Sequence, residues 1–236
     1  MLIDTTHRTD APEIMDDFTM QGQELRDTLD QIARINRILG GNRITLDGVK
    51  KLLARFPKDY EITIVDLGCG NGDMLRMLSD FGLRQDWHFK LIGVDANADT
   101  VRYARELSAV YPNISYVPID IFSADFDALQ YDIALCTLTL HHFSEDELLH
   151  LLTKLKRKVT VGIVVNDLHR SSLAYRLFQL AGWVFRLKKM PRNDGLISIL
   201  RGFKRAELEV FSQQLHLNST IRWKWAFRYQ WIISKI

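Results

Sequence analysis

The feature that most constrains the fold of this chain is an alternation of short apolar runs with helical segments from residue 61 onward. Five runs rich in β-branched residues are separated by segments with helical character at 72–81, 97–110 and 145–157; the runs read "EITIVDL", "FKLIGVD", "ISYVPI", "YDIALC" and "VTVGIVV". Strands that are apolar on both faces and alternate with helices are typical of a parallel sheet covered on both sides. We therefore predict an α/β fold with a doubly wound sheet.

The first run leads into a loop in which three glycines alternate with other residues, "DLGCGNGD". A dinucleotide fingerprint, G-x-G-x-x-G, would need a third glycine at position 73, where this chain has Asp73. The Gly-Lys-Ser/Thr sequence of a P-loop is absent as well. Because Asp66 and Asp73 flank the loop, a polyphosphate would be repelled, and a ligand that carries positive charge is favoured.

Two further acidic residues follow the next two apolar runs. Asp95 closes "LIGVD", 25 residues after Gly70, and Asp120 closes "VPID". Because parallel strands end at one edge of a sheet, Asp66, Asp95 and Asp120 are expected at that edge, where open α/β sheets bind ligands. An acid on the second strand can accept both hydroxyls of a ribose, and an acid on the third can reach a purine amino group. The pattern predicts a nucleoside site.

These stretches together, "VDLGCGNGD", "LIGVDAN", "VPIDIF" and "YDIALCTLTLHHF", resemble successive motifs of the class I S-adenosylmethionine-dependent methyltransferases over residues 62 to about 167. The resemblance implies a Rossmann-like, doubly wound seven-stranded sheet, mostly parallel with an antiparallel last strand, and S-adenosyl-L-methionine as the cofactor. It also implies that the glycines admit the methionine part, that Asp95 binds the ribose and that Asp120 flanks the adenine. The cofactor-binding residues so implied are Asp66, Gly68, Cys69, Gly70, Gly72, Asp95, Ala96, Asp120, Ile121 and Cys136.

Downstream, "VVNDLHRSSLAY", with the leading "MDDF" and "ARINRILGGN", is similar to small-molecule methyltransferases found beside bacterial type III polyketide synthases, which methylate phenolic products. The similarity implies an enzyme of secondary metabolism that O-methylates a phenolic or polyketide-derived hydroxyl. C- or N-methylation of a quinone-like or amine substrate is an alternative. A non-catalytic cofactor-binding partner subunit is an alternative from another class.

A phenol must lose its proton near neutral pH, a task suited to histidine. His141 and His142 follow the fourth run in "LHHF", and His169 follows the fifth in "NDLHR". We predict His169 and His142 as catalytic residues. A cofactor-shaping role for one of the pair, and a helix-entry network around His169, stay open.

A metal is not expected in this site. Divalent-metal catechol chemistry needs an acid after the fourth strand and an Asp-Asn pair after the fifth. This chain has Cys136-Thr137 and Asn166-Asp167 at those places.

Helical segments flank the predicted sheet on both sides in sequence. Residues 22–41 have apolar residues at helical spacing and end in Gly40-Gly41, a left-handed stop, and a short helix follows at about 46–55. Helices are also predicted in "SSLAYRLFQLAGWVFRL" and "RAELEVFSQQL", and the alternating aromatic run from 219 predicts a strand or a hairpin.

We expect residues 1–60 to form an N-terminal helical appendage or lid. Residues 61–236 would form the methyltransferase domain, with inserted lid helices at about 171–215. The lid is expected to be lined by apolar groups, with His169 near the transferred methyl and with Arg170 and Arg192 around the mouth.

The net charge of +2 conceals a division along the chain: residues 1–150 carry 14 Lys and Arg against 25 Asp and Glu, and residues 151–236 carry 17 against 4. The two halves can simply neutralise each other in one fold, or the basic half can face an anionic small-molecule acceptor. No recognised nucleic-acid motif accompanies the basic residues, so no nucleic-acid partner is predicted. A homodimer stays open.

An acidic start and the lack of an 18-residue uncharged apolar run predict a cytoplasmic protein that is not integral to a membrane. Cys69 and Cys136 show neither a C-x-x-C pair nor metal-ligand spacing. Two free thiols are therefore expected.

Overall fold

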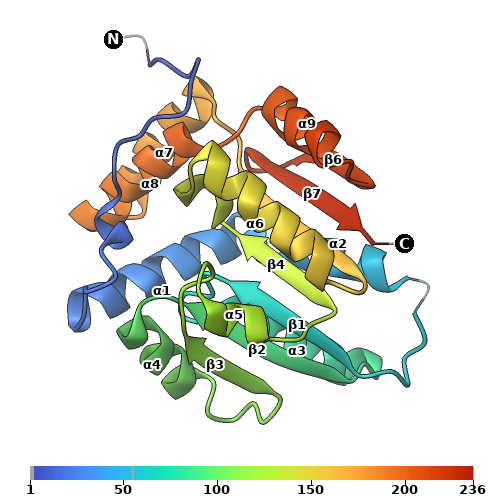
Figure 1. Cartoon of the computed structure of the whole chain (residues 1–236). Coiled ribbons are helices and arrows are strands. Elements are labelled where there is room, and N and C mark those ends of the chain that lie inside the picture. Colours follow the sequence, from blue (N-terminus) through green and yellow to red (C-terminus); the bar gives the residue numbers. More distant parts are fainter. Residues whose placement is uncertain (1–2, 55, 236) are drawn as a thin grey trace.

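The computed structural model describes residues 3–54 and 56–235, and its centre is a seven-stranded sheet with helices on both faces (Figure 1). The strand order is β3-β2-β1-β4-β5-β7-β6; the strands are β1 (Ile62–Leu67), β2 (Phe89–Asp95), β3 (Ile114–Pro118), β4 (Ile133–Thr137), β5 (Gly162–Leu168), β6 (Ser219–Lys224) and β7 (Arg228–Ser234). Strands β1 to β5 are parallel, and β7 is antiparallel to both β5 and β6. The predicted mostly parallel sheet with an antiparallel last strand is confirmed.

Three helices cover each face of this sheet. One face carries α5 (Ala124–Ala128), α6 (Glu145–Lys158) and α9 (Arg205–Gln214), and the other carries α2 (Gly41–Leu53), α3 (Asp73–Gln85) and α4 (Ala98–Leu107). The strand order reverses between β1 and β4, because β1 pairs with β2 on one side and with β4 on the other. In open α/β sheets this reversal opens a crevice at the carboxyl ends of the strands.

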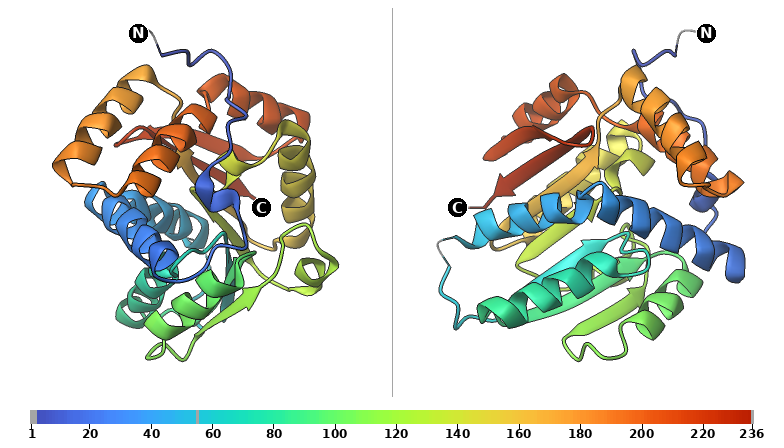
Figure 2. Two further views of the ribbon diagram at one scale, coloured as in Figure 1. Left: turned by 90° about the vertical axis from the view of Figure 1, so that its left-hand side faces the viewer. Right: turned by 180° about the vertical axis from the view of Figure 1, so that it is seen from behind.

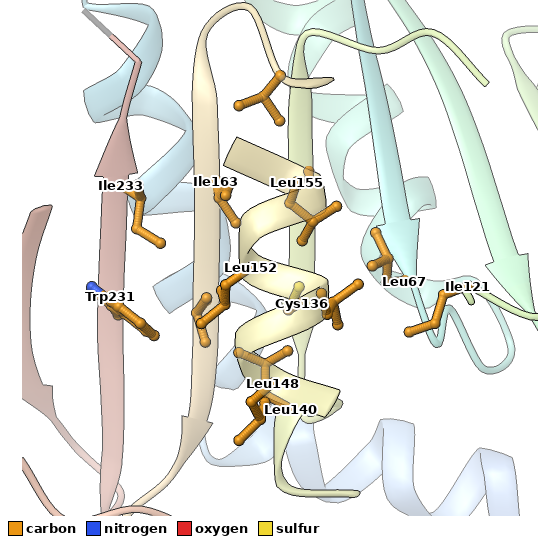
Figure 3. Close-up of a cluster of buried hydrophobic side chains, with 14 of the residues drawn as sticks. Leu67, Ile121, Cys136, Leu140, Leu148, Leu152, Leu155, Ile163, Trp231 and Ile233 are labelled. Carbon is orange, nitrogen blue, oxygen red and sulfur yellow. The ribbon is translucent and has the colours of Figure 1, made fainter. Parts of the chain in front are cut away.

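Helix α6 illustrates how the sequence builds one face of the core. It begins at a capping box, in which the Ser144 hydroxyl accepts from the Glu147 backbone and Glu147 reaches back to the cap. Its leucines recur at positions that place them on one side of the helix. Figure 3 shows these leucines facing strand residues of the sheet; Leu148, Leu152 and Leu155 lie against Cys136, Ile163, Trp231 and Ile233.

Helix α2 differs from the expected appendage, because it is part of the sheet's covering layer. Its Val49, Leu52 and Leu53 are buried in the core, and it packs against β4, β5 and β7. Gly48 permits the contact, since a Cβ there would lie 2.5 Å from Val164 Cγ1. The helix also begins earlier than predicted, at Gly41, and the predicted end at Arg55 lies outside the described residues.

The remaining helices gather at the carboxyl edge of the sheet. These are η1 (Ile14–Asp16), α1 (Gln23–Ile38), η2 (Leu140–His142), α7 (Ser172–Val184) and α8 (Lys189–Arg201). Helix α8 packs against α1, η1 and η2, and α7 packs on α8. Figure 2 shows α7 and α8 as a helical pair beside α1, outside the sheet. Among the described residues, no helix combines the length and apolar character that a membrane crossing requires.

Helix α9 is separate from this group. Its Leu208 and Phe211 are buried in the same core cluster as Trp231, so it covers the sheet beside β6 and β7. Of the helices expected in a lid at about 171–215, only α7 and α8 lie at the carboxyl edge.

Candidate active site

The first three strands bring acidic side chains to one edge of the sheet. Asp66 lies near the end of β1, opposite Gly93 of β2, and Asp95 ends β2 opposite Pro118 of β3. Asp120 follows β3 by two residues, is exposed, and accepts a hydrogen bond from the Phe122 backbone at 2.9 Å. The strand order reverses between β1 and β4 beside this edge, and open α/β sheets bind ligands at such a reversal.

The glycine loop between β1 and α3 has a left-handed backbone at all three glycines, with φ of 66°, 52° and 78° at Gly68, Gly70 and Gly72. At Gly72 an added Cβ would lie 2.0 Å from Tyr116 Oη, so this glycine permits close packing of the helix start on β3. At Gly70 only Leu29 Cδ2, at 3.7 Å, would lie within 4 Å. The backbone at Gly70 is therefore open to a ligand.

The carboxylate of Asp66 is buried and lacks a partner for one oxygen. Within residues 3–54 and 56–235, its Oδ1 has no hydrogen-bond donor. Burial raises the pKa of Asp66 well above its usual range, and the charges of Asp73 and Asp95 raise it further. A buried acceptor without a donor is costly, so the site suits a ligand that brings a donor and positive charge.

Asp95 lies between the glycine loop and the following helix. Its Oδ2 accepts from the Gly70 backbone at 3.2 Å, and its Oδ1 accepts from the Asn97 backbone at 3.0 Å. Burial raises the pKa of Asp95 to about 6, although these two hydrogen bonds and the charge of His142 act in the opposite direction. His142 is therefore an electrostatic neighbour of the predicted ribose-binding acid.

Other predicted cofactor residues have side chains that pack inside the protein. The thiol of Cys136 is fully buried beneath α6, with Leu140 and Leu152 (Figure 3). Ile121 is 8% exposed in the same cluster, and Cys69 is buried in the cluster on the opposite face. The structure thus corrects any expectation of ligand contact through the Cys136 thiol, while Ala96, next to Asp95, is partly exposed at the edge.

The two histidines after β4 each face a different carboxylate. His141 Nδ1 lies 2.7 Å from Asp167 Oδ1, and His142 Nδ1 lies 2.8 Å from Asp16 Oδ1. Their rings are 4.3 Å apart, and Glu13 Oε1 lies 3.7 Å from His141 Nε2 and 4.0 Å from His142 Nδ1. His141 is buried, whereas the side chain of His142 is 28% exposed. Only His142 is placed to meet a ligand.

The N-terminal segment that supplies Glu13 and Asp16 is held by polar contacts from distant parts of the chain. Asp194 accepts from the backbone of Ile14 and Met15, and the Ser198 hydroxyl donates to Glu13 at 2.7 Å. Arg8 and Arg201 contribute further bonds: Arg8 donates to the carbonyls of His141 and Phe143, and Arg201 donates to Asp16 and to the carbonyl of His142. Sequence reasoning missed this network, because its partners are up to 188 residues apart.

Glu13, His141 and His142 have ligand atoms within 4.8 Å of one another, close enough to consider a metal ion. The guanidinium of Arg201 already lies 3.5 Å from Glu13 and 2.7 Å from Asp16. An arginine that shares these carboxylates opposes a second cation, so the geometry favours a hydrogen-bonded network over a metal centre.

His169 lies away from this cluster. Its ring accepts from Trp223 Nε1 at 3.2 Å and packs against Phe227 and Tyr229, on the side of β5 that faces β7 and not β4. Burial lowers the pKa of His169, and the charges of Arg170 and Lys204 lower it further. This placement does not support the prediction that His169 lies near the transferred methyl.

Arg170 also differs from its prediction. It is 1% exposed, pairs with Glu207, and donates to the carbonyls of Thr5, Thr6 and Gly202. It therefore anchors the N-terminal segment inside the protein, and the expectation that it lines the mouth of the site is wrong. Arg192 is exposed.

Comparison with known proteins agrees with this geometry. Residues 64–162, which include the glycine loop, Asp95 and both histidines of "LHHF", match the family model described as "Methyltransferase domain". Residues 64–162 of this chain thus carry a methyltransferase domain. A plantazolicin methyltransferase solved with S-adenosylhomocysteine shares the fold with a TM-score of 0.66 and 18% identity, over 90% of both chains.

Further matches to this methyltransferase domain cover less of each protein. A protein-lysine N-methyltransferase of Saccharomyces cerevisiae is 40% identical over 86 residues, 35% of this chain and 35% of that protein. A trans-aconitate 2-methyltransferase of Azoarcus is 34% identical over 73 residues, 30% of this chain and 26% of that protein. The methyltransferase domain of citrinin polyketide synthase shares the fold with a TM-score of 0.61 at 13% identity, over 81% of this chain and 52% of that one. The match thus spans about a third or less of the length of the lysine N-methyltransferase and the trans-aconitate 2-methyltransferase.

The residues at the sheet edge fit the cofactor of this methyltransferase family, S-adenosylmethionine. Its sulfonium and amino groups would bring positive charge to an edge that is rich in carboxylates, and its amino group could donate to the buried, unpartnered oxygen of Asp66. The open backbone at Gly70 gives the ligand room.

Proposed function

We propose that the methyltransferase transfers the methyl group of S-adenosylmethionine to the oxygen of a small phenolic or polyketide-derived acceptor. The observation that supports this best is the pair formed by Asp16 and His142, of which His142 lies on the turn that follows β4. Oxygen acceptors of this kind carry a proton that must leave, and a histidine oriented by a carboxylate is suited to remove it.

In this proposal, Asp16 holds the imidazole of His142 in one tautomer. An ionised carboxylate accepts a hydrogen bond from Nδ1–H, so the lone pair of the neutral ring is on Nε2, where the acceptor hydroxyl can meet it. Burial raises the pKa of Asp16, but hydrogen bonds from His142 and Arg201 outweigh it, and the pKa of Asp16 is held below its usual range. Asp16 therefore stays ionised when His142 takes up the proton.

The cofactor supplies a methyl group on a sulfonium, and the chain's residues orient and enclose it. Asp95 would accept from the ribose hydroxyls, and Asp66 would accept from the amino acid part. Asp120 and Ala96 would flank the adenine, and Ile121 would contribute only its backbone because its side chain packs in the core. As the acceptor oxygen bonds the methyl carbon, the carbon–sulfur bond breaks and its electron pair stays on sulfur. The acceptor proton goes to His142 Nε2 and then to water.

The N-terminal segment and helices α1, α7 and α8 form the lid in this proposal. Leu29 of α1 lies above Gly70, and α8 packs against the histidine turn η2 and the N-terminal turn η1. These elements exclude water from the site and fix the acceptor against the cofactor, and orientation of this kind is worth about 7 to 11 kcal/mol in favourable cases.

The test is transfer of an isotope-labelled methyl group from S-adenosylmethionine to a panel of phenols. We expect methylated oxygen in the product, identified by NMR, and a loss of about a hundredfold or more in kcat with His142→Gln. His88→Gln, at an exposed position, is the matched control.

Binding of S-adenosylhomocysteine is measured by calorimetry in the same preparations. Full activity in His142→Gln would contradict the assigned base. A product methylated on carbon or nitrogen would replace the oxygen proposal by the alternative acceptor class; among the similar proteins, one is a lysine N-methyltransferase and another is a carbon methyltransferase.

A further inference from the structure

Helix α7 exposes an apolar face that the proposed function does not use. Leu173, Leu177, Leu180 and Val184 follow the spacing i, i+4, i+7 and i+11, which places them on one side of the helix. Their exposed fractions are 56%, 41%, 58% and 58%. The opposite side of α7 packs on α8, where Ala174 and Gly182 are buried. This face therefore points outward from the helical pair that Figure 2 shows.

Trp183 stands beside this stripe and is 74% exposed. Tryptophan has an apolar ring and a polar N–H, and it is enriched where apolar lipid meets water. Phe185, directly after the helix, is 39% exposed. A cluster of large apolar side chains on one exposed helix marks an interaction site, since isolated exposed leucines are common but contiguous patches are not.

The charges around the face are of one sign. No acidic residue occurs from 171 to 193, whereas this stretch holds five basic residues within and after α7: Arg176, Arg186, Lys188, Lys189 and Arg192. Lys188 pairs with Asp27. Arg176, Arg186, Lys189 and Arg192 form no ion pair with any described residue and are exposed.

We propose that α7 docks flat on the surface of an anionic lipid bilayer, with its leucine face in the lipid and the four unpaired basic side chains on the headgroups. An exposed apolar stripe with tryptophan at its border and unpaired basic residues beside it is the pattern of helices that lie in the membrane interface. The charge complementarity selects a negatively charged surface. Anionic lipid would then be the partner of basic residues in the second half of the chain, and the methyl-transfer site offers these residues no such partner.

Docking at α7 would bring the acceptor site close to the lipid surface. Helix α8 lies between α7 and the histidine turn η2, so one layer of helix separates the docking face from His142. An acceptor that partitions into a bilayer would then meet the enzyme where it is concentrated.

Co-sedimentation with lipid vesicles tests the proposal without using enzyme activity. We expect the full chain to bind vesicles of equal parts phosphatidylglycerol and phosphatidylcholine, and to bind pure phosphatidylcholine about tenfold less well. Raising the salt concentration from about 0.05 to about 0.5 M should weaken binding to the anionic vesicles, because exposed charges are screened.

The variant Leu177→Asp/Leu180→Asp should lose vesicle binding by about tenfold or more. The matched control is Leu83→Asp/Val210→Asp, which makes the same change of charge at two exposed apolar residues on α3 and α9. Both proteins should bind S-adenosylhomocysteine as the parent does, which shows that they are folded.

Two results would overturn the docking proposal. One is no binding to anionic vesicles, or equal loss of binding in the control and the α7 variant. The other is a dimer in sedimentation velocity that Leu177→Asp/Leu180→Asp converts to monomer, because the face would then be covered by a second copy of the chain. Failure of either kind leaves methyl transfer to phenols untouched, so the two proposals are tested separately.

Discussion

Asp16 and His142 are 126 residues apart in the sequence, yet Asp16 Oδ1 lies 2.8 Å from His142 Nδ1. The contact joins the N-terminal turn η1 to the turn that follows β4. Arg201 of α8 donates to the same carboxylate and to the carbonyl of His142. The orientation of one imidazole therefore depends on three parts of the chain.

Replacing Asp16 with Asn tests this dependence. The amide cannot stabilise a protonated imidazole as the carboxylate does, so we expect kcat/KM to fall about tenfold to a hundredfold while affinity for S-adenosylhomocysteine is kept. Asp17→Asn, at the exposed neighbouring position, is the control and should leave both values unchanged.

Cofactor affinity should depend on pH through Asp95. Burial raises the pKa of Asp95 to about 6, and only the ionised carboxylate accepts from both ribose hydroxyls. Affinity for S-adenosylhomocysteine should therefore be constant above about pH 7 and fall by up to about tenfold per pH unit below the pKa. Calorimetry across this range measures the effect.

The variant Asp95→Asn should bind more weakly at pH 7, by about 1 to 3 kcal/mol, and should lose most of the pH dependence. Asp99→Asn, on the adjoining helix α4, serves as the control. An unchanged pH dependence in Asp95→Asn would assign the titration to another group.

The packing of α2 on the sheet predicts a stability effect far from the chemistry. A methyl group at position 48 would lie 2.5 Å from Val164 Cγ1, so Gly48→Ala should lower the free energy of unfolding by about 1 to 3 kcal/mol through overpacking. Arg43→Ala, at an exposed position of the same helix, should stay within about 0.5 kcal/mol. Urea unfolding followed by circular dichroism distinguishes the two; equal stabilities would show that α2 can shift to accommodate the methyl.

Arg170 predicts a larger effect, because its charge is buried against Glu207 and three carbonyl groups. Arg170→Leu leaves these acceptors without donors and should cost about 3 to 5 kcal/mol of unfolding free energy. The N-terminal segment should also become more sensitive to proteolysis, since Arg170 holds the carbonyls of Thr5 and Thr6. Arg205→Leu, which removes an exposed pair with Glu209, should cost about 1 kcal/mol or less.

The sheet could be predicted from sequence because its signals are local. Runs that are apolar on both faces mark strands. The glycine loop and the acidic residues that follow the first strands lie at one edge of the sheet because these strands are parallel. The place of α2 could not be predicted in the same way. Its helical periodicity shows that it is amphipathic. Gly48 indicates close packing on the sheet only when Val164 is known to lie opposite it.

The residues of the candidate site differ in the same way: some have a local signal in the sequence, and others do not. Asp66, Asp95 and Asp120 each come at or just after the end of a successive strand, so the sequence alone predicts that they share one edge of the sheet. His169 was misjudged because position after β5 does not tell which neighbouring strand the side chain meets; it packs with the β6–β7 hairpin. Glu13 and Asp16 carried no usable signal, since an acid in an N-terminal segment is ordinary until its distant partner is known.

The acidic cluster at the sheet edge also bears on what happens after the reaction. Before transfer, the cofactor's sulfur is positively charged, and the carboxyl groups of Asp66, Asp73 and Asp95 are near enough to act on one another electrostatically. Methyl loss leaves a neutral thioether, while the protein's own groups stay where they are. The electrostatic attraction that favours the reactant is thus diminished for S-adenosylhomocysteine. We expect a site of this charge to bind S-adenosylhomocysteine less tightly than S-adenosylmethionine, which would limit product inhibition.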